Sequence, residues 1–269
     1  MLKGFVTGIF LLCFGLINAQ ISTYIGVKPN ALGNAAVNLN GVWSLKNNPG
    51  VFGFMEKSQV SVVYQNRFIL SELSTQSLAF GYHTNLGNLG LFFHQSGFEL
   101  YRAVQIGGAY GLKLSPKLGM GVNFSYQQTR FGDIYGGKHH FIAGLGVQYK
   151  LSQSLFIGAG LQNINRSKLS DFQNERLPTI FSMGVLYKIS PKVVWVLDLE
   201  KEITEKLNVK SGLAIKSHHN FEVRLGVNSY PFQSSFGFGV YIKELVIDFA
   251  AIWHASIGLT PSLGILYKF

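Results

Sequence analysis

The chain has 269 residues and a formal net charge of +10, but only 13% of its side chains are charged. A length of this order is typical of one domain, and the single cysteine, Cys13, excludes a disulfide within the chain. The lysines are dispersed and form no basic arm, which argues against a nucleic-acid partner. Beyond residue 20 no uncharged run reaches the ~20 apolar residues of a transmembrane helix.

Residues 1–19 have the composition of a secretory signal peptide. Lys3 gives an early positive charge, residues 5–17 form an apolar run too short for a membrane-spanning helix, and Ala19 ends a tolerable cleavage site. A bulky leucine precedes Cys13, where a lipoprotein signal usually has a small residue. We therefore expect export with cleavage near Ala19 and a mature chain with no thiol and no lipid anchor.

Residues 20–56 show no regular alternation and are rich in small residues and asparagine. A proline fixes its own φ and restricts the residue before it to an extended conformation, and asparagine side chains satisfy backbone groups in turns. The segment therefore suits a turn packed inside another structure. Its motif residues are Gly33, Asn34, Asn47, Asn48, Pro49 and Gly50.

From residue 57 to residue 269, large apolar residues alternate with Gly, Ser, Asn and Gln, as in the stretch 118–127. A period of two places the two sets on opposite faces of a strand, and no helical pattern is available to cover the apolar face. The pattern predicts an all-β fold: a 14-stranded antiparallel transmembrane β-barrel, with lipid outside, a polar lumen inside and residues 20–56 as an N-terminal plug or hatch. The expected strands are 57–69, 74–85, 88–98, 101–114, 117–131, 138–151, 154–164, 178–190, 192–204, 206–217, 219–230, 233–243, 245–256 and 258–269.

The plug motifs and the strand count resemble the FadL-like outer-membrane barrels, including the PorV/PorQ branch of Bacteroidota. Those barrels begin with a Gly-rich hatch that contains Asn-Pro-Ala followed by Gly. This chain has Gly50 where alanine is expected, and it lacks the acidic residues common before the motif. The resemblance implies a bacterial outer-membrane location and, for the PorV/PorQ branch, a role in type IX protein secretion.

The predicted barrel wall has an inner face rich in glycine. These glycines leave room for an inserted plug, although glycine also relieves crowding in a twisted sheet. The predicted inward glycines are those at positions 107, 111, 119, 121, 144, 146, 158, 160, 237 and 239.

Several charged residues also fall at inward positions, and buried charges persist only when they are paired or wet. We expect a salt-bridge network that holds the plug to the wall; the alternative is a solute-lining or gating role. Its members are Asp198, Lys210, Glu222, Arg224 and Asp248.

A second set of charges follows the tight turns, which face the periplasm in outer-membrane barrels. The set would suit anionic headgroups of the inner leaflet or, as the alternative, an acidic periplasmic partner. It comprises Lys57, Lys113, Lys117, Lys150, Lys188, Lys192, Lys216, Lys243 and Lys268.

The last predicted strand places Leu263, Ile265, Tyr267 and Phe269 on one face and ends on an aromatic residue. It looks like the C-terminal strand that the barrel-assembly machinery recognises, and its aromatic residues would join a girdle at the membrane interface. The alternative is an ordinary amphipathic edge strand.

Enzymatic function is not indicated. The histidine pairs 139–140 and 218–219, together with His254, lie in no nucleophile motif, and neighbouring residues of a strand point to opposite faces, which is poor metal geometry. We predict a non-enzymatic barrel without cofactor or metal, whose partners are outer-membrane lipids, the barrel-assembly machinery during biogenesis and proteins of an envelope complex, with no nucleic acid.

Two functions follow from the sequence. Several predicted outer loops are very short, which favours an accessory or structural subunit of a cell-envelope protein secretion or assembly complex over a free-standing receptor. The alternative is a passive transporter of small hydrophobic molecules, as in FadL, which needs an apolar pocket beside the hatch and a gap in the wall.

Overall fold

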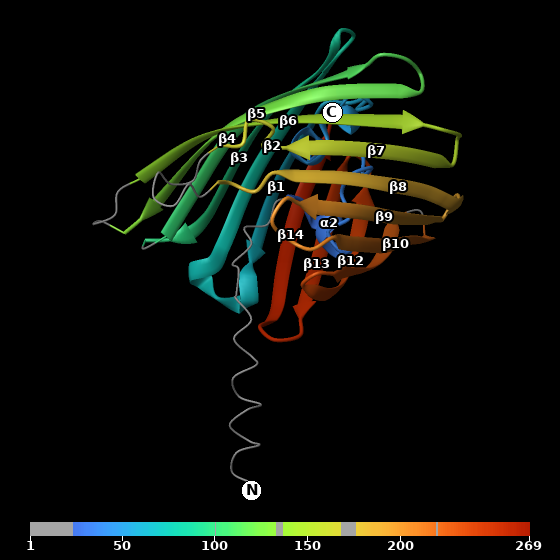
Figure 1. Cartoon of the computed structure of the whole chain (residues 1–269). Helices are drawn as coiled ribbons and strands as arrows, with labels where there is room; N and C mark the ends of the chain where they lie inside the picture. Colours follow the sequence, from blue (N-terminus) through green and yellow to red (C-terminus); the bar gives the residue numbers. More distant parts are fainter. Residues whose placement is uncertain (1–23, 100, 133–136, 168–175, 219) are drawn as a thin grey trace, which may run out of the picture.

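The structure, a computed structural model, describes residues 24–99, 101–132, 137–167, 176–218 and 220–269. The described residues form a closed antiparallel barrel of fourteen strands, in which neighbours in sequence pair and β1 closes on β14 (Figure 1). The strands are β1 Gln59–Asn66, β2 Ser74–Thr84, β3 Gly87–Phe98, β4 Tyr101–Lys113, β5 Leu118–Phe131, β6 Gly137–Lys150, β7 Leu155–Gln162, β8 Ile180–Ser190, β9 Val193–Glu202, β10 Asn208–His218, β11 Phe221–Ser229, β12 Phe232–Ile242, β13 Leu245–His254 and β14 Gly258–Lys268.

The predicted fourteen-stranded barrel is confirmed. Each expected strand is present, and the largest difference in its bounds is at the end of β1, which stops at Asn66 instead of residue 69. The chain leaves the strand there because two 3-10 turns follow, η1 (Arg67–Ile69) and η2 (Ser71–Leu73), with Phe68 and Ile69 at positive φ.

The period of two decides which side chains face out. In β2, Ser77 and Ala79 are buried in the lumen while Leu78 and Phe80 are 45% and 39% exposed on the outside. Exposed large apolar residues recur on the outer face of every strand except β7, whose outward residues are partly buried. A continuous apolar surface of this extent is not tolerated in water, so the outer face is suited to lipid. Among the described helices, none is long and apolar enough to cross a bilayer.

Residues 24–56, here called the internal segment, contain three short helices: α2 (Val27–Ala31), α3 (Ser44–Asn47) and α4 (Pro49–Phe52). Helix α2 contacts β11 to β14, whereas α4 contacts β4 to β7 on the other side of the barrel. The segment therefore crosses the lumen, and most of its residues are buried.

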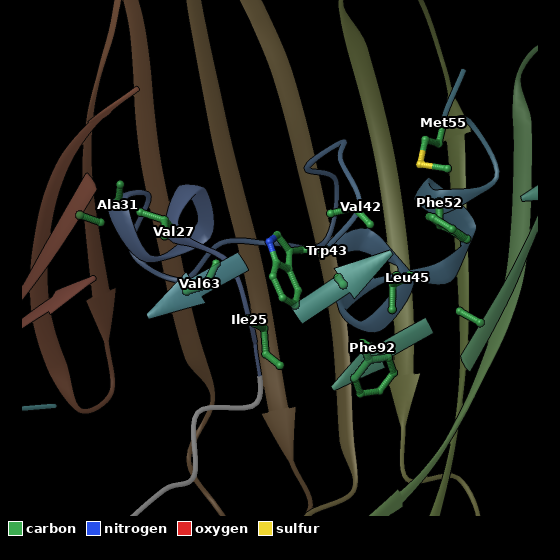
Figure 2. Close-up of a cluster of buried hydrophobic side chains, with 13 residues drawn as sticks. Ile25, Val27, Ala31, Val42, Trp43, Leu45, Phe52, Met55, Val63 and Phe92 are labelled. Carbon is green, nitrogen blue, oxygen red and sulfur yellow. The ribbon is translucent and has the colours of Figure 1, made fainter. Parts of the chain in front are cut away.

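The internal segment has an apolar core of its own. Ile25, Trp43 and Leu45 of the segment pack with Val63 of β1 and Phe92 of β3, as Figure 2 shows. Burial of apolar surface at roughly 25 cal/mol per Å² therefore helps to keep the segment in a lumen whose wall is otherwise largely polar.

The two ends of the barrel differ in their connections. At one end, the turn end, the strands are joined by short connections, and both the start of β1 and the end of β14 lie there. At the other, the loop end, the connections include η1 and η2 and the longer stretches 163–179 and 203–207.

Candidate functional site: the lumen and its internal segment

Asn48 ties the internal segment to itself and to the wall. Its Oδ1 accepts a hydrogen bond from the Gly50 amide at 3.0 Å and so caps α4, while its Nδ2 donates to the carbonyl oxygens of Val37 (2.8 Å) and Val147 (3.1 Å). Pro49 occupies the first position of α4, where its missing N–H costs nothing.

Gly50 marks a close approach of two backbones. A Cβ at this position would lie 2.5 Å from the Cα of Val147 in β6. No alternative side chain fits without moving the helix from the wall, which explains glycine where the resembling family has alanine.

The remaining motif residues close the N-terminal part of the segment. Asn47 accepts from the Ile25 amide at 3.1 Å and donates to the Ile25 carbonyl at 2.9 Å. Gly33, at φ +68°, donates its amide to Ser235 Oγ at 2.9 Å, and Asn34 continues the turn at φ 62°.

The inward glycines serve both roles expected from the sequence. Glycines 111, 119 and 121 face backbone atoms of Pro49, Gly50 and Gly53, so they make room for α4. Glycines 107, 144 and 239 instead face side chains of the wall itself.

Arg224 is the centre of one charged cluster and is fully buried. Its guanidinium donates to Glu222 at 2.6 Å, to Asp248 at 2.6 Å and to the Tyr241 hydroxyl at 3.2 Å. Glu222 also pairs with Lys28 of the internal segment at 3.1 Å. This cluster therefore joins α2 to the wall. Lys28 belongs to it, although it was not predicted from the sequence.

Asp198 and Lys210 do not form the ion pair with each other that their shared sector of wall suggested. Asp198 accepts the amides of Ala36 (2.6 Å) and Val37 (2.9 Å) from the internal segment, while Lys210 pairs with Glu200 at 2.8 Å. The backbone amides of a turn satisfy the Asp198 carboxylate, and Lys210 pairs instead with Glu200, two residues further along β9.

A cavity of about 110 Å³ lies between the internal segment and the wall, near the turn end. Its apolar lining comes from Val27 and Trp43 of the segment and from Val63, Val246 and Leu266 of the wall. Its charged lining includes Lys28, Arg224, Asp248 and Lys268. Lys28, Arg224 and Asp248 are already paired, whereas Lys268 forms no ion pair with a carboxylate of the described residues, and Gln59, Ser61 and Tyr241 add polar groups to a lining that is otherwise apolar.

The wall is continuously paired over most of its circumference. In the described ladders, the register shifts only between Lys188 and Ser190 and between Lys216 and His218, both at the turn end. At the loop end, the ladder between β6 and β7 begins only at Gly144. Before that point, the side-chain Nδ2 of Asn165 donates a hydrogen bond to the carbonyl oxygen of Phe141. The loop-end half of β6 thus lacks a regular partner strand on one side.

The other predicted residues occupy separate places. Leu263, Ile265, Tyr267 and Phe269 are about half exposed on the outer face, where the rings of Tyr267 and Phe269 stack. Their role in targeting stays a prediction.

The predicted signal peptide and its cleavage site lie outside the described residues. The described residues contain no group of three or more His, Cys, Asp or Glu placed to hold a metal ion.

The barrel, its polar inner face and its internal segment define the FadL-like fold of outer-membrane proteins. The chain is similar to the toluene transporter TbuX of Ralstonia pickettii (13% identity, 92% of this chain and 99% of that chain, TM-score 0.73). It is also similar to the monoaromatic hydrocarbon channel CymD (13%, 92% and 98%, TM-score 0.72) and to a FadL homologue of Pseudomonas aeruginosa (11%, 93% and 99%, TM-score 0.62). No protein-family model and no curated protein sequence matches the chain. Because the sequence identities are this low, the structural similarity establishes the fold and no more.

Proposed function

We propose that this protein is a non-enzymatic outer-membrane barrel that passes a small hydrophobic compound of about the size of a single aromatic ring. The observation that carries the proposal is the cavity between the internal segment and the wall, in a fold shared with solved toluene and monoaromatic hydrocarbon transporters. An apolar cavity of about 150 Å³ binds benzene, so a volume of about 110 Å³ lies at the lower limit for one aromatic ring and is too small for a long acyl chain.

The internal segment gives the barrel its selectivity. It fills the lumen with buried side chains and ties itself to β9 through Asp198 and to β11 through Glu222. In this proposal the internal segment blocks a water-filled pore for polar solutes, whereas an apolar solute has a binding place beside Trp43 and Val63.

Two neighbouring residues of β1 test the proposal, because they face opposite sides of the wall. Val63 lines the cavity, whereas Val62 is 54% exposed on the outer face. Val63→Phe fills part of the cavity. One added or lost methylene group in an apolar pocket changes discrimination between substrates by about tenfold or more. We therefore expect toluene uptake to be about tenfold slower in this variant. The measurement is uptake of radiolabelled toluene by cells that produce the barrel in their outer membrane.

Val62→Phe is the matched control and should take up toluene at the parent rate. Both variants must show the same heat-dependent mobility on a denaturing gel, which reports a folded barrel. Equal uptake by folded Val63→Phe and parent, or uptake by the parent no faster than by cells without the barrel, would contradict transport through this cavity.

The second candidate function is an accessory barrel of an envelope secretion or assembly complex. The short connections at the loop end favour it: only Tyr230 and Pro231 separate β11 from β12, and residues 255–257 separate β13 from β14. Copurification from native membranes distinguishes the two functions, because a stable protein partner supports the complex and a solitary barrel with toluene uptake supports transport.

A further inference from the structure

The nine lysines of the turn-end set all lie at one end of the barrel. Five of them end strands or lie two residues before a strand's end: Lys113, Lys150, Lys188, Lys216 and Lys268. Others lie in the connections, as Lys117, Lys192 and Lys243 do. Among the described residues, none of the nine forms an ion pair with a carboxylate.

Several side chains of this set point toward the lumen. The Nζ of Lys150 lies 3.8 Å from the ring centroid of Phe54, which belongs to the internal segment. The Nζ of Lys188 lies 4.8 Å from the ring of Phe156, on the same inward face as Gly158, and Lys268 lines the cavity. The ammonium groups therefore surround the inner mouth of the barrel.

Exposed apolar residues also lie at this end of the barrel. The most exposed is Leu86 at 82%, and others are Leu114, Leu151, Ile189 and Ile242. Lipid headgroups lie outside the wall, next to these apolar residues, so the inward lysines are poorly placed to meet them. This direction favours the alternative raised by their position in the sequence, an acidic partner, over lipid headgroups.

The size of the mouth indicates the kind of anion that it fits. Fourteen strands about 4.8 Å apart and tilted by about 40° form a ring roughly 28 Å across. A small anion would meet only one or two of these lysines. An extended acidic polypeptide crossing or entering the mouth would meet several, and desolvation would be slight because most of the lysines are exposed.

We propose that the turn-end mouth of this barrel is a docking surface for an acidic polypeptide segment of a protein on that side of the membrane. Like charges concentrated at the rim of a concave surface attract and steer an oppositely charged partner, and salt weakens that attraction. Docking at this site needs no solute in the cavity, although Lys268 belongs both to the turn-end set and to the cavity lining.

The test uses the purified full-length barrel in discs of zwitterionic lipid and a fluorescein-labelled decaglutamate peptide, with binding read by fluorescence anisotropy. The rim variant carries Lys113→Gln, Lys150→Gln and Lys188→Gln. The control variant makes the same net-charge change at the loop end, with Lys138→Gln, Lys201→Gln and Lys206→Gln. Both must keep the heat-dependent gel mobility of the parent.

We expect peptide binding by the parent that weakens as salt rises, about tenfold weaker binding by the rim variant, and near-parental binding by the control. No peptide binding by the parent, or equal loss in both variants, would overturn the proposal. A parent that does not bind the peptide, but whose thermal stability rises when the discs contain phosphatidylglycerol and rises less in the rim variant, would overturn it in favour of lipid.

Discussion

At the scale of single residues, the internal segment is held by polar side chains that satisfy backbone groups. Asn48 alone serves three backbone groups, one of them in β6, and it is fully buried. A buried group left without a partner costs about 1–3 kcal/mol, and loss of a helix cap about 1 kcal/mol. The hydrogen bonds of such asparagines therefore hold the segment more firmly than burial of their small apolar area would.

Asn48→Ala should lower the free energy of unfolding by about 2–3 kcal/mol, because it leaves the Val37 and Val147 carbonyls and the Gly50 amide without their partner. Urea unfolding in lipid or detergent, followed by tryptophan fluorescence, measures the change. Asn40→Ala, an exposed asparagine of the same segment, is the control and should change little. Equal effects of the two substitutions would refute the bridging role of Asn48.

Lys46 predicts a pH effect. The side chain is only 8% exposed, and burial lowers its pKa from the ordinary 10.5 to about 8. The unfolded state then binds more protons between pH 8 and 10.5, so this group makes the folded state more stable as pH rises through that window and contributes a constant penalty below it.

Lys46→Met removes that penalty. The variant should exceed the parent in unfolding free energy at pH 7, and the difference should shrink as the pH is raised from 8 toward 10.5. Denaturant midpoints of both proteins at a series of pH values check this. A difference independent of pH would show that packing, and not the charge, sets the effect.

At the scale of elements, α4 and the wall strands β4 to β6 meet backbone to backbone. Gly50 and the facing glycines permit this contact, since a Cβ at Gly111 would lie 2.5 Å from the Gly53 amide nitrogen. The short helix has little area with which to bind the wall, so the close approach and the Asn48 hydrogen bonds have to supply its position.

Gly50→Ala should release α4 from the wall, at a cost of about 1–3 kcal/mol, because the atoms in the way are backbone and cannot rotate aside. Trypsin cleavage after the buried Lys46, identified by mass spectrometry, should become faster. Gly108→Ala is the control, because a Cβ there would find only ordinary contacts at 3.4–3.5 Å. Unchanged cleavage in Gly50→Ala would contradict this expectation, because it would show that the wall accommodates the added Cβ without releasing α4.

The elements were predictable from the sequence to different degrees. The strands follow from the alternation of residues such as Leu78 and Ala79, because each position of a strand in the wall faces either the outside or the lumen. The partners of lumen residues do not follow from it: Asp198 binds amides of a distant turn and Lys210 binds Glu200, and such choices depend on where the internal segment lies. The cavity depends on the same packing, so no pattern in the sequence reveals it.

At the scale of the whole molecule, the barrel divides its tasks among three regions. The apolar outer face suits lipid, the internal segment occupies the lumen and leaves a cavity with apolar and charged lining beside Trp43, and the turn-end mouth carries lysines that form no ion pair with a carboxylate among the described residues. The Arg224 cluster and Asp198 connect the first two regions, since they hold the internal segment to a wall that is paired around its circumference.

The measurement that tests the central claim most directly is a crystal structure of the barrel soaked in 4-bromotoluene, with the bromine located by its anomalous signal. The proposed function predicts an anomalous peak inside the cavity, between Trp43 and Val63, and the loss of that peak in Val63→Phe. A peak only on the lipid-facing surface, or an occupied cavity in Val63→Phe as in the parent, would contradict it.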